Sequence, residues 1–405
     1  MPSFRTLDDL DPGQRLLVRL DLNSPIEDGE PQDNRRFSRH AATIRELIEA
    51  DHRIALMAHQ GRPGRDDFVS LSGHAQILSG HLDHPVDFVP DTHGEEAIAA
   101  IRELEAGDVL LLENTRMCED ELPEESPEAK ADTEYVRALA PEFDAYVNDA
   151  YSAAHRSHAS LVGFPLALPA YAGRVMETEY EANTAIASRA FDGRVTMVVG
   201  GTKATDVIEA LDAVGDRIDT VCLGGIAGEL FLRGAGHPVG YDLDDADLYD
   251  SQWEGNEGTI EAVIAERGDQ LALASDLAYE DDEGERAEIA VADIDEKAHS
   301  YLDVGTGTVE EYAEIIRDSE AVFVKGALGV FEDERFAEGT VGVLEAIAET
   351  DCFSVVGGGD TSRAIGMYGM DEADFSHASI AGGAYLRALT GEPLPAVEAL
   401  KAVAE

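Results

Sequence analysis

The chain has 405 residues, of which 83 are acidic and 30 basic, so its formal net charge is −53, and 44% of its residues are hydrophobic. The hydrophobic content excludes a mainly disordered chain, and the charge disfavours a general binder of nucleic acid or of anionic membranes. No apolar run reaches the length of a membrane span, the N-terminus lacks the order of a signal peptide, and three scattered cysteines indicate no disulfide framework. We therefore expect a cytoplasmic protein.

The acidic residues are spread along the whole chain, and only five of the basic residues are lysines. This composition resembles that of proteins from a salt-saturated cytoplasm, where a Debye length of about 3 Å screens the repulsion between surface carboxylates. An ordinary acidic cytosolic protein is the alternative, but so large a charge would strain an ordinary domain. In such a chain, an arginine cluster or a lone lysine in a glycine-rich loop indicates a local anion.

Short apolar runs alternate with amphipathic stretches of helical period, which predicts βαβ units and parallel sheets with helices on both faces. We predict strands at Arg15–Leu20, Arg53–Ala58, Asp108–Leu112, Ala145–Val147, Val195–Val199, Thr220–Leu223, Gln270–Ala274, Ala321–Val324 and Phe353–Val356. We predict helices at Arg39–Ala50, Glu95–Leu104, Lys130–Leu139, Val207–Val214, Thr308–Ile316 and Gly339–Ala348. The fold class is therefore α/β.

The candidate ligand-binding residues change in type along the chain. They are mainly Arg and His in the first half, and Gly, Lys, Asp and Glu in the second. We predict an N-terminal lobe at residues 1–172, a connecting helix or hinge at 173–190 and a C-terminal lobe at 191–389. The amphipathic tail, residues 390–405, is expected to dock back onto the N-terminal lobe.

Polar and basic residues follow the strands of the first half, where ligands of open α/β sheets bind. They are Asp21, Asn23, Arg35, Arg36, Arg39, His59, Arg62, Arg116, His155, Arg156 and His158. Arginine binds carboxylate and phosphate in bidentate fashion, so the group predicts a small polyanionic ligand. A surface ion pair is the alternative for any single arginine. A metal site is disfavoured because no His pair has a recognised helical metal spacing.

Glycine-rich turns follow the strands of the second half, at residues 200–201, 224–225, 357–359 and 382–383. Backbone N–H groups at such turns and at helix N-termini favour phosphate. Lys203 and Lys325 lie in these loops, and Asp360, beside three glycines, suits a phosphate-bound Mg²⁺. Helix capping or simple solvation is the alternative for Asp360 and Glu332. Neither GxxxxGK[ST] nor GxGxxG after a strand occurs, so neither common nucleotide motif applies.

Over nearly its whole length the chain resembles phosphoglycerate kinases of a salt-adapted type, through the ordered motifs VRLDLN, MAHQGRP, LLENTR, YVNDAYSAAHRSHAS, VVGGTK, GGIAGELF, GALGVFE, VVGGGDTS and SHASIAGGA. The resemblance implies a monomeric enzyme with two Rossmann-like parallel-sheet lobes joined by a helical hinge. It implies reversible phosphoryl transfer between 1,3-bisphosphoglycerate and ADP, giving 3-phosphoglycerate and ATP, with Mg²⁺ as cofactor, in glycolysis and gluconeogenesis.

The resemblance also implies roles for individual residues. The triose acid is expected to bind Asp21, Asn23, Arg36, His59, Arg62, Arg116 and Arg156. The nucleotide is expected to contact Lys203, Gly225, Glu332 (toward the ribose), Gly357, Gly358, Gly359, Asp360 and Thr361, with Asp360 on Mg²⁺. Transfer is expected to be in line, without a covalent intermediate, with Arg36, Lys203 and the amides near Gly359 and Gly383 stabilising the transition state.

Three positions depart from the family pattern. Val207 stands where many members carry a second lysine, and Lys325 stands where they usually carry asparagine. We hypothesise that Lys325 supplies the missing charge and belongs to the nucleotide site. Ile380 and Ala381 replace the usual Thr and Gly of the last glycine-rich loop.

Two other functions are possible on the residues alone. A non-catalytic two-lobed anion-binding protein also closes around its ligand, but it needs neither Asp360 beside a glycine turn nor Lys203. An oxidoreductase with a bound dinucleotide is disfavoured by the missing GxGxxG motif and ribose-binding acid.

Overall fold

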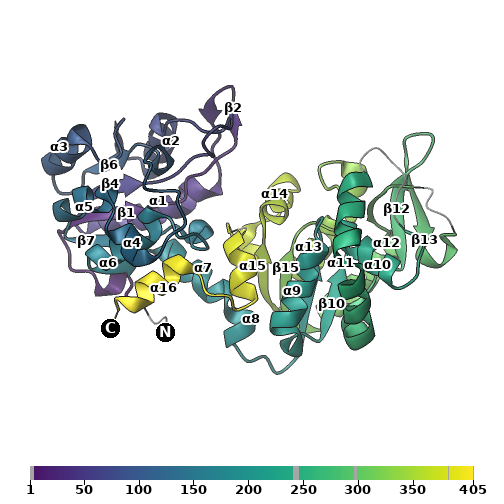
Figure 1. Cartoon of the computed structure of the whole chain (residues 1–405). Coiled ribbons are helices and arrows are strands. Elements are labelled where there is room, and N and C mark those ends of the chain that lie inside the picture. Colours follow the sequence, from purple (N-terminus) through teal and green to yellow (C-terminus); the bar gives the residue numbers. More distant parts are fainter. Residues whose placement is uncertain (1–3, 240–245, 296–298, 382, 405) are drawn as a thin grey trace. The chain divides into compact units, whose positions relative to one another are not determined.

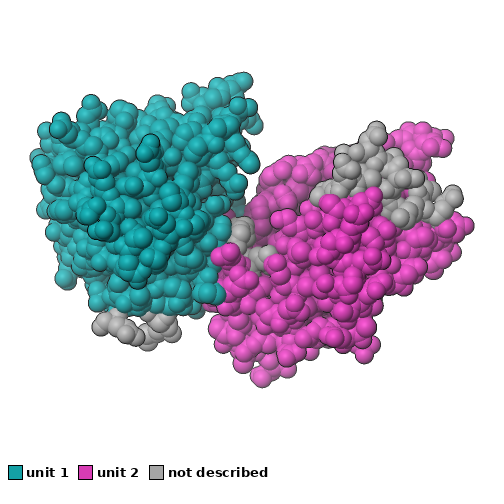
Figure 2. Space-filling view, viewed as in Figure 1, with its two compact units in different colours: residues 1–181, 393–405 teal, residues 182–392 magenta. Residues whose placement is uncertain are grey.

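The computed structural model describes residues 4–239, 246–295, 299–381 and 383–404. Its contacts divide the chain into two compact units, residues 1–181 with 393–405 and residues 182–392 (Figure 2). The first boundary falls inside helix α7 (Arg174–Asn183), within the segment expected to connect the two lobes. The action of this segment as a hinge stays a prediction.

Unit 1, residues 1–181 with 393–405, contains a six-stranded parallel sheet with the strand order β5-β6-β4-β1-β7-β8 (Figure 1). The strands are β1 (Arg15–Arg19), β4 (Arg53–Met57), β5 (Asp87–Val89), β6 (Val109–Leu112), β7 (Ala145–Asn148) and β8 (Ala170–Ala172). Leu16, Leu17 and Val18 are fully buried, as expected for a central parallel strand covered on both faces. A short hairpin, β2 (Ile26–Glu27) and β3 (Glu30–Pro31), follows β1.

The helices of unit 1 are α1 (Arg35–Glu49), α2 (Ser72–Leu82), α3 (Glu95–Glu103), α4 (Pro127–Ala131), α5 (Glu134–Leu139), α6 (Phe164–Ala167), most of α7 and α16 (Pro395–Ala402). The apolar side of α1, which includes Phe37, Ile44 and Leu47, is buried in the same core as β1 and β4. Helix α16, drawn in yellow, contacts α6 and β8 (Figure 1). The end of the chain therefore completes unit 1.

Unit 2, residues 182–392, contains a second six-stranded parallel sheet with the order β11-β10-β9-β15-β16-β17. The strands are β9 (Arg194–Val199), β10 (Thr220–Leu223), β11 (Leu271–Ala272), β15 (Ser319–Lys325), β16 (Phe353–Gly357) and β17 (His377–Ala378). A three-stranded antiparallel sheet is inserted between β11 and β15, with β12 (Asp276–Glu280) between β13 (Arg286–Ala290) and β14 (Tyr301–Val304).

The helices of unit 2 are α8 (Ala185–Ser188), α9 (Ala204–Val214), α10 (Gly225–Gly234), α11 (Ala246–Arg267), α12 (Thr306–Arg317), α13 (Glu338–Ala348), α14 (Gly359–Met367) and α15 (Gly383–Leu389). Helices α9, α10, α14 and α15 each begin within five residues of the end of a strand of the parallel sheet, as a βαβ order requires. The predicted α/β class with two parallel-sheet lobes is confirmed.

All nine predicted strands are present, but some predicted bounds are wrong. Helix α1 begins at Arg35 rather than Arg39, because Asn34 caps it by accepting the N–H of Arg36 at 3.0 Å. The single helix predicted at residues 130–139 is two helices, since Thr133 caps a new start with its side chain. The antiparallel sheet was not predicted, because its strands carry few buried apolar residues.

Candidate active site

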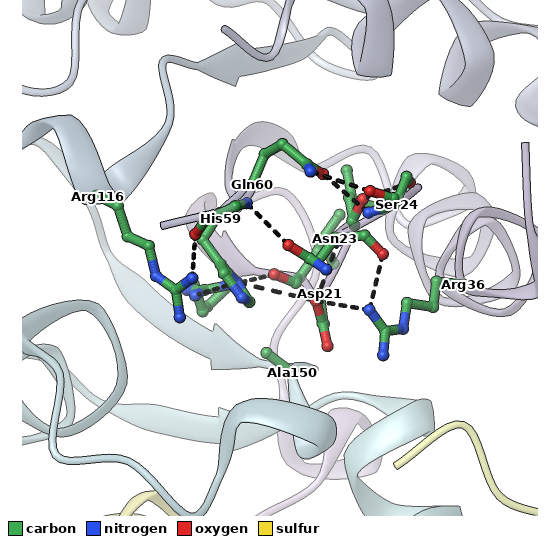
Figure 3. Close-up of polar contacts among 12 residues, drawn as sticks. Asp21, Asn23, Ser24, Arg36, His59, Gln60, Arg116 and Ala150 are labelled. Carbon is green, nitrogen blue, oxygen red and sulfur yellow. Dashed lines mark hydrogen bonds and ion pairs between the residues drawn. The ribbon is translucent and has the colours of Figure 1, made fainter. Parts of the chain in front are cut away.

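The carboxyl edge of the unit 1 sheet gathers the side chains that the sequence assigned to an anion. They come from the segments after four neighbouring strands: Asp21 and Asn23 after β1, His59 and Arg62 after β4, Arg116 after β6 and Arg156 after β7. Figure 3 shows Arg116 beside His59 and Arg36 beside Asp21. The strand order therefore brings together residues that are far apart in the sequence.

Arg36 lies in the first turn of α1 and faces the end of β1. Its Nη1 donates a hydrogen bond to the carbonyl oxygen of Asn23 over 2.7 Å and lies 3.6 Å from Oδ1 of Asp21. A cation at a helix N-terminus is opposed by the helix dipole. The guanidinium group of Arg36 therefore favours a neighbouring anion. The carboxylate of Asp21 is one such anion, and an anionic ligand would be another.

Asp21 is a buried carboxylate, with its side chain 4% exposed. Burial by itself raises its pKa, but the positive charge of Arg36 and the amide hydrogen bond from Asn23 outweigh burial and hold the pKa well below the usual range. Asp21 is therefore ionised at any working pH, and it fixes the position of Arg36.

Gly61 joins the segment after β1 to the segment after β6. Its N–H donates to Oδ1 of Asn23 over 2.9 Å, and its carbonyl oxygen accepts a hydrogen bond from Nη1 of Arg116. Its φ is +63°, and a Cβ atom at this position would lie 2.2 Å from the carbonyl oxygen of Asp67. Only glycine can therefore hold Asn23 and Arg116 in this arrangement.

Arg19 belongs to the site but was not predicted. It is fully buried, and its Nη2 lies 3.2 Å from Nδ1 of His59. Because arginine has only donors, Nδ1 must accept, so the proton of a neutral His59 is on Nε2. Burial lowers the pKa of His59 well below its usual value; Asp21 opposes this, whereas Arg19 adds to it. His59 is therefore neutral and does not form an ion pair with Asp21.

The charge of Arg19 is balanced through a buried serine. Nε of Arg19 donates to Oγ of Ser160 over 2.8 Å, and that hydroxyl donates to Oε1 of Glu121 over 2.6 Å. Glu121 is fully buried and also accepts the N–H of Ser160 over 2.8 Å. In the sequence, Arg19 looks like an ordinary strand residue. Only the structure shows that Ser160 and Glu121 are buried beside it and balance its charge.

The remaining arginines of the site repel one another. Burial and the neighbouring charges of Arg156 and Arg19 lower the pKa of Arg116 to about 10. Burial and the charge of Arg62 likewise lower the pKa of Arg156. Neither Arg62 nor Arg156 has an ion-pair partner within 4.0 Å among the described residues. A bound polyanion would relieve this repulsion.

In unit 2, a cavity of about 270 Å³ lies at the carboxyl edge of the parallel sheet. Its walls come from the segments after β9, β10 and β15, from α10 and β14, and from the start of α14. Three of the predicted nucleotide contacts, Gly225, Glu332 and Asp360, line it. Glu332 is exposed at its opening and lies 3.2 Å from Nη1 of Arg363.

The start of α14 forms the predicted glycine turn. Gly357 is the last residue of β16, and Gly358, with a φ of +106°, precedes the helix. Gly359 and Asp360 are exposed in the first turn, so their N–H groups and the carboxylate can be reached by a ligand. The hydroxyl of Thr361 is buried and donates to the carbonyl oxygen of Gly357 over 3.2 Å, so it serves the turn itself.

Lys325 is an ion-pair partner of Asp206, in the first turn of α9. Burial and the charge of Lys203 lower the pKa of Lys325 to about 8, although the charge of Asp360 opposes this shift. The ion pair with Asp206 also favours the charged form. Lys203 is exposed immediately before α9, so both lysines lie near the first turns of α9 and α14.

The departures from the family pattern have the following positions. Val207 is fully buried in α9, where it contributes to the core. Ala381 is buried and its N–H donates to Oγ of Ser379 over 3.1 Å. Gly383 is the first residue of α15, and Gly382 lies outside the described residues. The predicted amide contact of Gly383 stays a prediction.

One further residue of the cavity was missed. Glu229, in the middle of α10, lines the cavity and is only 4% exposed. The sequence gives no signal for it, because a single glutamate in an amphipathic helix normally faces solvent.

Comparisons with known proteins point to one family. The family model described as phosphoglycerate kinase matches residues 7–392. A phosphoglycerate kinase from Halorubrum lacusprofundi is 74% identical over 404 residues, which cover 100% of this chain and 99% of the relative. One from Haloarcula marismortui is 70% identical over 399 residues, covering 98% of this chain and 100% of the relative. The crystal structure of phosphoglycerate kinase from Pyrococcus horikoshii OT3 superposes with a TM-score of 0.91 at 33% identity, covering 98% and 99% of the two chains.

Proposed function

The chain belongs to the phosphoglycerate kinase family, and we propose that its two units divide the substrates between them. The enzyme moves a phosphoryl group between 1,3-bisphosphoglycerate and ADP, giving 3-phosphoglycerate and ATP, and so is a phosphotransferase with a carboxyl group as acceptor. In the proposal, unit 1 binds the triose acid at Asp21, Asn23, Arg36, His59, Arg62, Arg116 and Arg156. Unit 2 binds the nucleotide at its cavity and at the start of α14.

The observation that carries the proposal for unit 1 is the arginine cluster at one sheet edge. Arg62 and Arg156 have no ion pair among the described residues, although the chain has 83 acidic residues with which to pair them. A ligand with one carboxylate and one or two phosphates offers two separate anionic ends to such a cluster. The neutral His59 and the ionised Asp21 can in turn hydrogen-bond a hydroxyl group of the ligand.

For unit 2, the cavity takes the base and the ribose, with Gly225 in its wall and Glu332 at its opening. The amides around Gly357–Thr361, Lys203 and Lys325 then take the phosphates. Gly225 has a φ of +62°, and a Cβ atom there would lie 2.8 Å from the amide nitrogen of Gly201, so this wall requires glycine.

Asp360 fits the protein ligand of a magnesium ion carried by the nucleotide. Its carboxylate is exposed beside the amides of α14, and oxygen is the ligand that this hard cation prefers. Among the described residues no group of three or more His, Cys, Asp or Glu side chains could hold a metal ion by itself. When bound, Mg²⁺ would neutralise charge on the phosphate oxygens.

The proposed mechanism is direct in-line transfer without a covalent intermediate. Arg36 and Lys203 stabilise the charge that develops on the moving phosphoryl group, and the amides near Gly359 and Gly383 add hydrogen bonds. Arg36 is already positioned by Asn23 and Asp21, so little reorganisation is needed there. Because the two sites lie in different units, the reaction requires a closing motion about residues 173–190 that also expels water.

The alternative of a non-catalytic anion-binding protein does not account for the family match along residues 7–392. The salt-adapted phosphoglycerate kinase predicted from the sequence is confirmed by the relatives from Halorubrum and Haloarcula. Within the described residues, no helix combines the length and the apolar character needed to cross a bilayer. We further propose that the enzyme is a monomer of the cytoplasm, consistent with three free cysteines.

The test is ADP formation from ATP, Mg²⁺ and 3-phosphoglycerate in molar KCl, with a control that lacks the acid. We expect turnover only when 3-phosphoglycerate is present. In Arg62→Ala we expect the KM for 3-phosphoglycerate to rise at least tenfold, because a charged hydrogen bond worth roughly 1.5–3 kcal/mol is lost. Arg65→Ala is the matched control, because Arg65 is exposed in the same loop and should not change the KM. Acid-independent turnover, or equal effects of the two variants, would contradict the proposal.

A further inference from the structure

Glu121 is a fully buried carboxylate in a short run of acidic residues. Glu119, two residues earlier in the same run, is exposed, as charged side chains usually are. The carbonyl oxygen of Glu121 accepts hydrogen bonds from Nζ of Lys130 and from the N–H of Ala159, each over 3.3 Å. The backbone that carries this carboxylate is therefore fixed. A buried carboxylate is costly unless a positive charge compensates it.

The compensating charge is that of Arg19, which Glu121 holds through Ser160. Oε1 and Oε2 of Glu121 accept the hydroxyl group and the N–H of Ser160 over 2.6 Å and 2.8 Å. The hydroxyl oxygen in turn accepts from Nε of Arg19 over 2.8 Å, and the carbonyl oxygen of Leu20 accepts from Nη1. Two of the three guanidinium nitrogens are thus fixed. Because the group is planar, this directs the third, Nη2, at Nδ1 of His59 over 3.2 Å.

His158 does not take the place of Arg19 as the compensating cation. Its Nδ1 lies 3.7 Å from Oε1 of Glu121. Burial, together with the charges of Arg116, Arg19 and Arg156, lowers the pKa of His158 to about 3, so this ring is neutral at neutral pH. The charge of Glu121 is therefore available to Arg19.

The ring of His59 has a second possible tautomer, which this arrangement prevents. Nδ1 of His59 also lies 3.8 Å from Oδ1 of Asp21. Without Arg19 as its donor, Nδ1 would carry the ring proton toward this carboxylate, and Nε2 would become an acceptor. Nε2 has no hydrogen-bond partner among the described residues and the ring is 9% exposed, so Nε2 is the nitrogen that the ring offers to a ligand.

We propose that Glu121 is a positioning residue for the triose acid, which fixes His59 as the tautomer with its proton on Nε2. It acts through Ser160 and Arg19, because the compensated guanidinium group stays on Nδ1 and does not turn to the carboxylate of Asp21. An oxygen atom of the ligand is then the acceptor that the Nε2–H group matches. The inference rests on the triose-acid site proposed above and adds a residue that touches no substrate.

The first experiment reads the tautomer directly, from the ¹⁵N chemical shifts of the histidine rings in molar KCl at neutral pH. These shifts distinguish a protonated from an unprotonated ring nitrogen, and the signals lost in His59→Gln assign the residue. Glu121→Gln removes the charge and keeps the shape, and Ser160→Ala removes the bridging hydroxyl group and keeps the charge. Glu119→Gln is the matched control, because it removes the same charge from an exposed position.

We expect the wild type and Glu119→Gln to carry the proton of His59 on Nε2 alone. In Glu121→Gln and Ser160→Ala a large fraction of the protein should carry it on Nδ1. Since the Nε2–H group binds the ligand equally in the ground state and in the transition state, its loss should raise the KM for 3-phosphoglycerate and leave kcat unchanged. We expect a rise of about fivefold, the worth of one neutral hydrogen bond, with an unchanged KM for ATP.

A double-mutant cycle tests whether Glu121 acts through His59. In a His59→Ala background, Glu121→Gln should not raise the KM for 3-phosphoglycerate further, because the residue through which it acts is gone. If Glu121→Gln has its full effect in that background, it acts by another route and the inference is overturned.

The outcomes separate this inference from the proposed function. If the wild type shows no turnover that depends on 3-phosphoglycerate, the proposed function fails and the inference falls with it. If the wild type is active but carries the proton of His59 on Nδ1, only the inference is overturned. The same holds if Glu121→Gln is less stable but keeps the wild-type tautomer and KM, since its role is then structural. Should Glu121→Gln not fold, the tautomer and the KM of Ser160→Ala decide in the same way.

Discussion

His40 donates a hydrogen bond through Nδ1 to Oδ2 of Asp149 over 2.8 Å, and both side chains are fully buried. The direction follows from the other ring nitrogen, because Nε2 accepts the backbone N–H of Asp21 over 3.2 Å. Oδ1 of Asp149 accepts the N–H of Val175 over 2.8 Å, in the first turn of α7. The backbone at the anion site is thereby joined to the helix in which the chain leaves unit 1.

Replacing His40 by alanine should leave the carboxylate of Asp149 buried and less satisfied, and should free the backbone at Asp21. We expect a loss of about 1–3 kcal/mol in the free energy of unfolding, together with a higher KM for 3-phosphoglycerate. Denaturant unfolding and steady-state kinetics in molar KCl measure the two effects. The matched control is His81→Ala, which removes a 2.7 Å contact with Asp33 that is largely exposed and should cost less than about 1 kcal/mol. If both variants lost the same free energy of unfolding, burial of the His40–Asp149 pair could not explain the effect.

Replacing Gly61 by alanine should disrupt the anion site. The new Cβ atom would collide with the carbonyl oxygen of Asp67, which displaces the amide that holds Asn23 and the carbonyl group that holds Arg116. We expect at least a tenfold rise in the KM for 3-phosphoglycerate and a less stable unit 1. Gly64→Ala isolates the collision, because Gly64 also has a positive φ, +83°, but has no atom within 4 Å of the added Cβ. Gly64→Ala should show only the backbone cost, about 1–2 kcal/mol, with an unchanged KM.

Acid should destabilise unit 1 through His74. Its Nε2–H donates to Oε1 of Gln60 over 3.0 Å, its Nδ1 is buried without a partner among the described residues, and burial lowers its pKa to about 4. Between pH 6.5 and 4 the unfolded chain binds a proton that the folded chain does not, so stability is fully present above pH 6.5 and falls with the pH.

The measurement is the pH dependence of the free energy of unfolding between pH 6.5 and 5, above the range where most carboxylates titrate. His74→Leu should reduce the slope by about 1.4 kcal/mol per pH unit at its lower end, whatever its effect on the stability at pH 7. A slope equal to that of the wild type would show that His74 is protonated in the folded protein.

Lys325 should act on the nucleotide and not only on Asp206. For Lys325→Ala we expect a rise of about tenfold in the KM for ATP, because one charged contact to phosphate is lost. Asp206→Asn removes the ion-pair partner but keeps the shape, and should change the KM much less. If Lys325→Ala and Asp206→Asn lower the stability equally and both leave kcat and KM unchanged, the pair is structural and the hypothesis fails.

The net charge of −53 makes the fold dependent on salt. Lowering KCl from molar to millimolar concentration lengthens the Debye length from about 3 Å to 30 Å or more, so that the repulsion between surface carboxylates is no longer screened. We expect the melting temperature to fall steeply over this range. A melting curve that does not shift would show that the acidic surface is tolerated without salt.

The α/β class and most of the anion site could be predicted because they depend on local pattern. Strands such as Arg15–Arg19 are apolar runs, and the arginines after them stand out in an acidic chain. The antiparallel sheet could not be predicted in this way, since β13 is half-exposed and has the composition of a loop. Arg19 and Glu229 were missed for the opposite reason: each is a charged residue that only tertiary packing shows to be buried.

The order of the segments in unit 1 bears on how the protein is made. Helix α16 contacts β8 and α6, and the N–H of Ala396 donates to the carbonyl oxygen of Ala154 over 3.1 Å, two residues before Arg156. The ribosome therefore completes all of unit 2 before it supplies the last helix of unit 1. At roughly 5–20 residues per second this delay is on the order of ten to forty seconds, during which the first 181 residues lack their final support. The segment that carries Arg156 is thus synthesised well before the helix that packs beside it.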